Sequence, residues 1–274
     1  MERGEIRRAV VFPGQGSIGG DVSGEVREAV RERVGEEVPY QLSVFAGSVD
    51  LLYRLREAGV EPDVVAGHSL GEYAAAHAAG SITLEDAVWL VAERDRLMTE
   101  AARENLGGMV ALIGADPAEV ARAAEEAEGV VVAANFNTPR QTVISGKKDA
   151  LDAVAERVRG RRVELNVAGA FHSPLMLDAS RAMHARLAEV ALVDPRIPMV
   201  GATDGGVLAT AGDVRLALGN QMLSPVCWVA VIERFESLGV EEIVEAGEDG
   251  TLTRMLRDFR GKEIEGRTAK EVLA

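Results

Sequence analysis

The segment 67–73, GHSLGEY, holds the residue best placed to act as a nucleophile, Ser69. Ser69 lies in a G-x-S-x-G pattern whose outer positions are Gly67 and Gly71. The apolar run 64–66 before it predicts a buried strand, and the alanine-rich run after it predicts a helix. Strand, tight turn and helix are the context of a nucleophile elbow, in which the serine hydroxyl stands exposed. We expect both glycines to be needed where the backbones crowd, with N–H groups beside Ser69 facing an oxyanion.

An activated serine needs a base within hydrogen-bond reach, and the chain has four histidines. His68 adjoins the serine and is expected to point away from it. His77 and His184 lie within predicted helices, where a structural role is expected. His172 alone lies on a loop just before a predicted helix, where catalytic groups are often displayed. We therefore favour His172 as the base, with a structural loop histidine as the alternative.

The order of these residues disfavours an esterase or lipase. Serine hydrolases of the α/β class carry serine, acid and histidine in that order, with the histidine late in the chain. Here about 100 residues follow His172, and no acidic residue between Ser69 and His172 stands out.

Composition excludes several other classes. The 274 residues carry a formal net charge of −14, which argues against general nucleic-acid binding. No apolar run reaches the roughly 18 residues of a membrane span, so no membrane association is expected. The single cysteine, Cys227, excludes an internal disulfide and any multi-cysteine metal site. A reducing cytoplasm is therefore the expected compartment.

The order of predicted strands and helices indicates two structural units, one inserted within the other. Helices separate four predicted strands, which indicates a parallel α/β sheet; these strands are 8–12, 63–66, 198–201 and 241–246. Between them, the elements predicted in 106–168 follow the order βαββαβ of a ferredoxin-like unit. We therefore expect a catalytic domain made of 1–105 and 169–274, with 106–168 inserted as a small domain. The last dozen residues are charged, and we expect them to fray.

Four motifs in order resemble one known family, and a fifth segment, 135–146, resembles the small-domain hairpin of that family. The four motifs are FPGQGS at 12–17, GHSLGEY at 67–73, AFHSPLM at 170–176, and Asn220-Gln221 with Ser224-Pro225-Val226. The chain resembles the malonyl-CoA:acyl carrier protein transacylases and the related acyltransferase domains of polyketide synthases. The match covers nearly the whole chain. It implies an α/β-hydrolase-like large domain with a short parallel sheet and an inserted ferredoxin-like small domain.

The resemblance implies roles for five residues. Ser69 would carry the acyl group as an ester. His172 would take the serine proton and later protonate the leaving thiolate. The backbone N–H groups of Gln15 and Leu70 would form the oxyanion hole. The backbone carbonyl of Gln221 would orient His172 in place of a triad acid.

Two further residues would select the acyl group. Arg94, otherwise read as a solvated helix arginine, matches the family arginine that binds the free carboxylate of malonyl. A guanidinium fork pairs a carboxylate bidentately, which favours dicarboxylic acyl groups over acetyl. Phe171 resembles the residue of malonyl-specific members, and its bulk would crowd a branch methyl.

The implied reaction transfers malonyl from malonyl-CoA to the phosphopantetheine thiol of acyl carrier protein in fatty acid biosynthesis. It would be ping-pong, without metal or cofactor, in a monomer. One alternative is the same chemistry in a polyketide synthase or malonate decarboxylase system. Another is a serine hydrolase, and a third is a non-catalytic docking partner of the carrier protein.

Two features concern the partners. The region 18–66 is shorter than in most members, which affects the entrance for CoA. Carrier proteins of this system are acidic, so docking needs a local basic patch on this acidic chain. The small domain concentrates basic residues, either for docking or as a solvated helix face; they are Arg140, Lys147, Lys148, Arg157, Arg159, Arg161 and Arg162.

Overall fold

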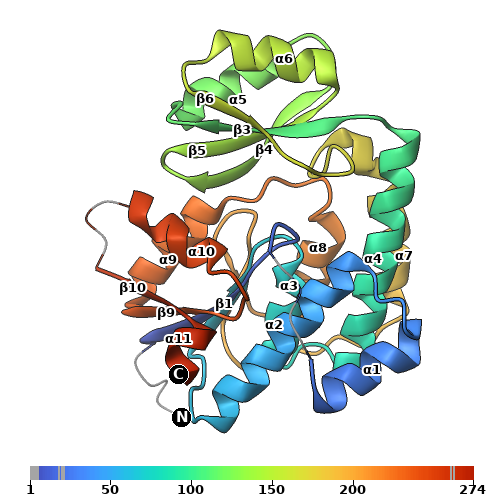
Figure 1. Cartoon of the computed structure of the whole chain (residues 1–274), viewed down its shortest axis with the longest axis vertical. Coiled ribbons are helices and arrows are strands. Elements are labelled where there is room, and N and C mark those ends of the chain that lie inside the picture. The colour runs from blue at the N-terminus through green and yellow to red at the C-terminus, as the bar shows by residue number, and fades with distance from the viewer. Residues whose placement is uncertain (1–5, 18, 20–21, 260, 262) are drawn as a thin grey trace.

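The computed structural model describes residues 6–17, 19, 22–259, 261 and 263–274. Residues 18, 20 and 21 of the short N-terminal region lie outside the described residues. The chain forms two β-sheets, each with its own helices (Figure 1). No helix within the described residues is long and apolar enough to cross a membrane.

The larger sheet has six strands in the order β10-β9-β1-β2-β7-β8. Its strands are β1 (Arg8–Phe12), β2 (Val64–Gly67), β7 (Met199–Val200), β8 (Val207–Leu208), β9 (Glu242–Glu245) and β10 (Glu265–Thr268). The four predicted strands form its centre and pair in parallel. The prediction missed both edges: β8 pairs antiparallel with β7, and β10 pairs parallel with β9. The carboxyl ends of β1 and β2, where ligands bind in such sheets, meet at one edge.

The expected fraying of the last dozen residues is wrong. Strand β10 is followed by the helix α11 (Ala269–Leu273), whose start is closed by a capping box between Thr268 and Glu271. Ala269 is fully buried. Neither residue pattern is strongly apolar, because an edge strand and a short helix bury little surface, so hydrophobic periodicity could not reveal them.

Helices cover both faces of the larger sheet. They are α1 (Gly24–Val34), α2 (Tyr40–Glu57), α3 (Gly71–Ala78), α4 (Leu84–Glu104), α7 (Leu177–Ala188), α8 (Ala211–Asn220), α9 (Trp228–Leu238) and α10 (Thr251–Met255). Successive residues of β1 face opposite sides of the sheet. Val10 and Phe12 pack in the core formed with α2, α3 and α4, whereas Ala9 and Val11 pack against α9. Burial on both faces explains the continuous apolar strands in the sequence.

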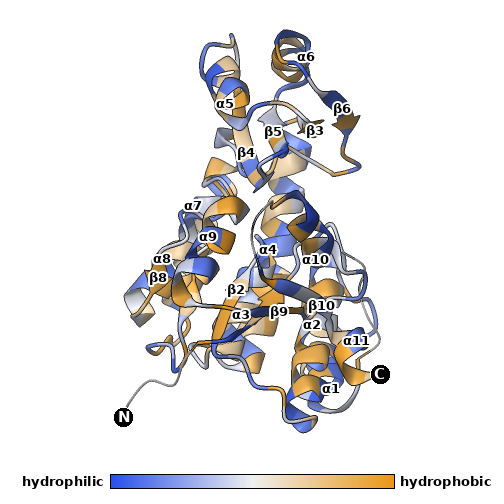
Figure 2. Ribbon diagram, turned by 90° about the vertical axis from the view of Figure 1, so that its left-hand side faces the viewer, coloured by the Kyte–Doolittle hydropathy of each residue, from blue (hydrophilic) through white to orange (hydrophobic). Residues whose placement is uncertain are grey.

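The smaller sheet confirms the predicted βαββαβ order. Its elements are β3 (Gly108–Ile113), α5 (Pro117–Glu125), β4 (Val131–Thr138), β5 (Gln141–Gly146), α6 (Lys148–Arg157) and β6 (Arg161–Glu164). The strand order is β4-β5-β3-β6, with every neighbouring pair antiparallel. Helices α5 and α6 cover the face that points away from the larger sheet (Figures 1 and 2). We propose 106–168 as the boundaries of this small domain.

Strand β4 also ties the two sheets together. The N–H of Val226 donates to the carbonyl of Ala134 at 2.8 Å, and the N–H of Phe136 donates to the carbonyl of Val226 at 2.8 Å. The pair Ser224-Pro225, a serine before a proline, predicts from the sequence alone that a helix opens there. This prediction is wrong, because α9 begins only at Trp228. The intervening residues are held extended by this pairing with β4, which no local pattern could indicate.

Candidate active site

Ser69 stands on the sharp turn between β2 and α3. Its φ of +52° lies in the left-handed region, which is costly for a residue with a side chain. A Cβ at Gly67 would overlap the backbone of Gly71, and a Cβ at Gly71 would overlap the carbonyl of Phe12. The crowding expected at these two glycines is therefore present. The turn leads Ser69 to the carboxyl edge of the sheet, where its side chain meets the loop before α7.

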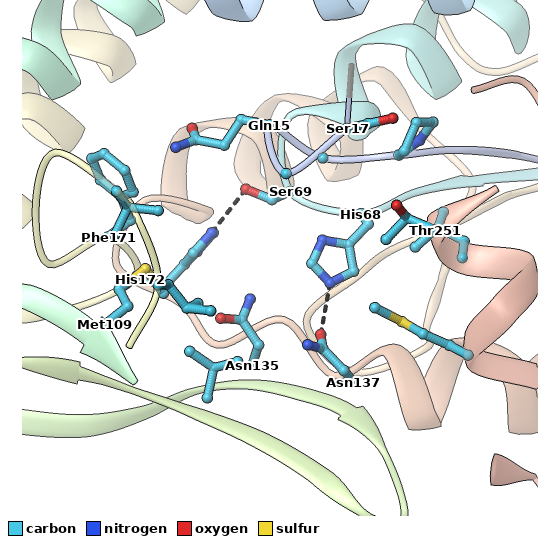
Figure 3. Close-up of a pocket in the computed structure, with 18 residues that line it drawn as sticks. Gln15, Ser17, His68, Ser69, Met109, Asn135, Asn137, Phe171, His172 and Thr251 are labelled. Atoms are coloured by element: carbon cyan, nitrogen blue, oxygen red, sulfur yellow. Dashed lines mark hydrogen bonds between the residues drawn. The ribbon is translucent and has the colours of Figure 1, made fainter. Parts of the chain in front are cut away.

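His172 is held against Ser69 from that loop. The Oγ of Ser69 lies 2.8 Å from Nε2 of His172 (Figure 3). Nδ1 of His172 lies 2.7 Å from the carbonyl oxygen of Gln221 and 3.1 Å from that of Ser224. Carbonyls only accept, so Nδ1 carries the proton and Nε2 is left to accept from the serine hydroxyl. This is the tautomer that a general base requires.

The backbone at His172 is strained as well. Its φ is +57°, and Ser69 and His172 are the two non-glycine residues with positive φ in the part of the chain that the structure describes. Strain of this kind persists only where the surrounding structure over-determines it, and it gathers at functional sites. Here Ser173 stabilises the turn: its Oγ donates to the carbonyl of Ala170 at 2.6 Å and accepts from the N–H of Leu175 at 3.2 Å.

The charge state of His172 fits a base. Burial, and then the positive charge of Arg94, lower the pKa of His172 to about 4, so the imidazole is neutral at pH 7. The other histidines face elsewhere. His68 binds Asn137 across the pocket at 2.9 Å (Figure 3), His77 binds Tyr53 at 2.8 Å, and His184 is bonded to Asn220 near the surface.

Arg94 lies behind the serine and is fully buried. From α4 it donates through Nη2 to the Oγ of Ser69 at 3.0 Å and through Nε to the Oε1 of Gln221 at 2.8 Å. A third donor, Nη1, binds Oε1 of Gln41 on α2. The solvated arginine weighed as the alternative reading of the sequence is thus ruled out by burial. Its guanidinium forms no ion pair with a carboxylate among the described residues, so one buried positive charge stands at the reacting oxygen without a direct counter-ion.

Two polar residues of this network were missed in the sequence. Gln41 is buried on α2, and Glu72 is buried in the first turn of α3. Glu72 lies within the elbow motif but carries no spacing signal that would separate it from an ordinary helix residue. Its Oε2 accepts from Nε2 of Gln221 at 2.9 Å, and its Oε1 accepts from the N–H of Ala202 at 3.0 Å. Burial raises the pKa of Glu72 to about 7.

Two residues were expected to supply the oxyanion donors, Leu70 and Gln15. Leu70 follows Ser69 at the start of α3 and is buried, while Gln15 lies in the glycine-rich loop after β1 and lines the pocket. Neither backbone N–H has a hydrogen-bond acceptor among the described residues. The lack of an acceptor at both N–H groups, among the described residues, is what an oxyanion hole requires, and their role as donors stays a prediction.

A pocket of about 180 Å³ opens in front of Ser69 and His172, between the two sheets. One wall comes from the larger sheet and includes the loop 13–17. The other comes from the small domain and is largely apolar, with Met109, Val143, Leu165 and Val167. Phe171 lines the same pocket beside His172 (Figure 3). Within the described ranges, no cluster of three metal-ligating side chains is present.

The sequence and the fold are both similar to those of known proteins. Residues 23–214 match the family model of the acyl transferase domain. The malonyl-CoA-acyl carrier protein transacylase of Salmonella typhimurium is 38% identical over 208 residues, which are 74% of this chain and 67% of that protein. The solved acyl carrier protein S-malonyltransferase of Vibrio cholerae is 31% identical with a TM-score of 0.89, covering 98% of this chain and 100% of that one.

A third match is a solved malonyl-transacylase in complex with the acyl carrier protein of a type II polyketide synthase. It is 28% identical with a TM-score of 0.84, and the match covers 96% of this chain and 94% of that chain. The family model spans well over half of the sequence. The chain therefore belongs to the acyl transferase family, among the malonyl-CoA:acyl carrier protein transacylases.

Proposed function

We propose that this chain transfers the malonyl group from malonyl-CoA to the phosphopantetheine thiol of acyl carrier protein, in fatty acid biosynthesis, through an ester on Ser69. One observation carries the proposal: the same serine oxygen lies 2.8 Å from a neutral histidine and 3.0 Å from a buried arginine without a carboxylate partner among the described residues. The first group activates a nucleophile, and the second offers a site for the free carboxylate of a dicarboxylic acyl group.

In the first half-reaction, Oγ of Ser69 attacks the thioester carbonyl carbon while Nε2 of His172 takes the hydroxyl proton. The carbonyl oxygen becomes an oxyanion that accepts from the N–H groups of Gln15 and Leu70. The C–S bond then breaks, and His172 returns its proton to the CoA thiolate. The carbonyl of Gln221 stabilises the imidazolium by accepting from Nδ1 throughout, as a carboxylate does in a triad.

The second half-reaction reverses these steps with a different thiol. The phosphopantetheine thiol gives its proton to Nε2 of His172 and attacks the ester carbonyl carbon. The C–O bond to Ser69 breaks, and His172 protonates the serine oxygen as it leaves. Only proton transfers and acyl transfer occur, so the sequence of steps uses no metal or redox cofactor.

Acyl selection is assigned to Arg94 and Phe171. Once Ser69 carries the ester, the Nη2 donor of Arg94 loses its hydroxyl partner, and the malonyl carboxylate would take that place. One charge-assisted hydrogen bond contributes about 1.5–3 kcal/mol, a discrimination of roughly tenfold to a hundredfold against acetyl. Phe171, which lines the pocket beside His172, would crowd a branch methyl and so favour malonyl over methylmalonyl.

The experiment is intact-protein mass spectrometry after brief exposure to malonyl-CoA, with acetyl-CoA in parallel and Ser69→Ala as control. We expect a gain of about 86 Da, the malonyl increment, which Ser69→Ala abolishes and acyl carrier protein clears. Thioester hydrolysis without an adduct would identify a serine hydrolase. If neither an adduct nor turnover were observed, the result would favour a docking protein without catalysis.

The alternative pathway is kept for one observation: the solved relative in complex with a polyketide carrier protein has the same fold over nearly the whole chain. A polyketide synthase or malonate decarboxylase system would use the same chemistry on Ser69. Clearing the malonyl ester with fatty acid and polyketide carrier proteins side by side would separate these pathways, because the true partner should clear it faster.

We also propose that the carrier protein docks on basic residues of the small domain. Arg157 forms an ion pair with Glu126, and Arg162 forms one with Asp152. Five other side chains are exposed and have no acidic partner among the described residues; they are Arg140, Lys147, Lys148, Arg159 and Arg161. These charges would attract an acidic partner to an otherwise acidic chain.

The cytoplasm is the proposed compartment, in keeping with the single cysteine, and the monomeric state stays a prediction.

A further inference from the structure

Glu72 is a buried carboxylate that the proposed mechanism does not use. Only 2% of it is exposed, and it lies next to the catalytic turn at the start of α3. Both of its oxygens accept hydrogen bonds, one from the N–H of Ala202 at 3.0 Å and one from Nε2 of Gln221 at 2.9 Å. A carboxylate that accepts at both oxygens is satisfied in its ionised form.

The side chain of Gln221 continues this contact to Arg94. Its Nε2 donates to Glu72 and, at 3.4 Å, to the carbonyl of Ser69, while its Oε1 accepts from Nε of Arg94 at 2.8 Å. The amide thus lies between a group that only accepts and a group that only donates. Rotating the amide by half a turn would set donor against donor at Arg94 and acceptor against acceptor at Glu72.

We propose that Glu72 is a positioning residue: its carboxylate fixes the amide of Gln221, and the amide fixes the guanidinium of Arg94 that receives the substrate carboxylate. This inference rests on the proposed function of Arg94 in malonyl selection. The amide between the two charges orients Arg94 and leaves its fork free of a carboxylate, so substrate can pair with it. A direct Glu–Arg ion pair at this place would compete with malonyl.

The near-isosteric variant Glu72→Gln tests this directly. A glutamine at 72 has one acceptor and one donor end, yet it faces two donors, Ala202 N–H and Gln221 Nε2. If its oxygen faces Ala202, its amide donor faces the donor end of Gln221, which then favours the rotated amide. The rotated amide would turn its own donor toward Arg94 and displace the guanidinium.

Binding should be measured by calorimetry in the Ser69→Ala background, where no acyl transfer occurs. We expect Glu72→Gln to weaken malonyl-CoA on the order of tenfold, at the lower end of the effect of one charge-assisted hydrogen bond, and to leave acetyl-CoA unchanged. A purely structural role would weaken both thioesters alike. Glu72→Asp keeps an acceptor-only group and should retain more of the preference for malonyl-CoA than Glu72→Gln.

Glu245→Gln is the matched control. Glu245 is also fully buried and accepts from the N–H and Oγ1 of Thr253, at 2.8 and 3.0 Å, but it forms no hydrogen bond with Gln221 or Arg94, which are both described residues. The variant Glu245→Gln should leave the ratio of the affinities for malonyl-CoA and acetyl-CoA unchanged. The inference would be overturned if folded Glu72→Gln kept the wild-type ratio of affinities for malonyl-CoA and acetyl-CoA, or if Glu245→Gln lowered that ratio by as much. It would also be overturned if Glu72→Asp and Glu72→Gln lowered the ratio equally.

These experiments distinguish a failure of the inference on Glu72 from a failure of the proposed transfer function. If wild type forms the malonyl ester and passes it to acyl carrier protein while Glu72→Gln keeps its full preference, only the inference on Glu72 fails. If wild type forms no ester but Glu72→Gln loses affinity for malonyl-CoA alone, the transfer function fails and the positioning role stands.

Discussion

The two walls of the pocket differ in kind. The wall from the larger sheet carries a continuous buried hydrogen-bonded network; its side chains are Ser69, His172, Arg94, Gln221, Gln41 and Glu72. The wall from the small domain presents mainly Met109, Val143, Leu165 and Val167. The side chains proposed for proton transfer and charge thus lie on one side of the pocket, and the polar side chains of the small domain that line it are the neutral amides of Asn135 and Asn137.

The apolar wall follows from the alternation of residues along the small sheet. Met109 and Val143 point toward the larger sheet and join its core, whereas Val110, Leu112 and Ile144 point to α5 and α6 and form a separate core. A sheet that is buried on both faces has apolar residues on both. We therefore expect the polar wall to determine the rate and the choice of acyl group, and the apolar wall to limit the access of water to an ester on Ser69.

The largest effect is expected from His172→Ala. Loss of a general acid and base should lower the rate of malonyl transfer by about 10²–10⁴-fold. The steady-state rate with malonyl-CoA and acyl carrier protein measures it. His184→Ala is the matched control, because His184 is exposed on α7 and should leave the rate nearly unchanged. A loss of less than tenfold in a folded His172→Ala would contradict the placement of the base on the polar wall.

Arg94→Lys should mainly change substrate choice. Lysine keeps a positive charge but lacks the planar fork, so the ratio of kcat/KM for malonyl-CoA to that for acetyl-CoA should fall by roughly tenfold to a hundredfold. Arg96→Lys on the same helix is the control, since Arg96 is exposed and its ion pairs among the described residues are with Glu93 and Glu100. Equal losses for both thioesters would remove Arg94 from selection.

The ratio of kcat/KM for malonyl-CoA to that for acetyl-CoA should depend on pH through the protonation of Glu72. Burial raises its pKa to about 7, so the carboxylate that holds Gln221 predominates above pH 7 and is lost below it. The charged or titratable groups that act on Glu72 are Arg94, Tyr73 and Asp204. The malonyl to acetyl ratio should therefore fall as the pH drops from 8 to 6, and Glu72→Gln should abolish this dependence. Protonation of His172 near pH 4 affects both substrates and cancels in the ratio.

The apolar wall should govern the fate of the ester. Leu165→Ser introduces a polar group into the pocket that Ser69 also lines, and it should increase hydrolysis of the malonyl ester about threefold, while transfer stays within about twofold. Leu106→Ser is the control, because Leu106 is 75% exposed and does not line the pocket. Decay of the mass adduct without carrier protein measures hydrolysis. A loss of transfer as large as that of His172→Ala would break the division between the walls.

The smallest effect is expected on the outer surface of the small domain. The double reversal Arg159→Glu and Arg161→Glu should raise KM for acyl carrier protein severalfold at low salt and leave KM for malonyl-CoA unchanged. Reversal of Arg27 and Arg31 on the distant α1 is the matched control (Figure 1). An unchanged KM for the carrier protein would remove this patch as the docking surface.

Much of the fold followed from local patterns. The central strands are buried on both faces, so they are continuous apolar runs that alternate with amphipathic helices, and the small domain shows its βαββαβ order for the same reason. The family resemblance is confirmed by the match of 23–214. The edge strands β8 and β10 escaped prediction because they are short and lack buried residues, so they carry little apolar pattern. Val226 escaped it because its extended backbone is held by pairing with Asn135 of β4, which lies far away in the sequence.

By itself, the sequence indicated the two residues that we propose to carry the chemistry: a glycine-flanked serine between strand and helix, and one histidine on a loop. Only the tertiary structure decided how they are held. It brings Ser69 and His172 together across 103 residues, with both backbones at positive φ. It also buries Glu72, Gln41 and Arg94 in one network. Burial decides this because a polar group without water must find its partner in space, and sequence spacing does not record that distance.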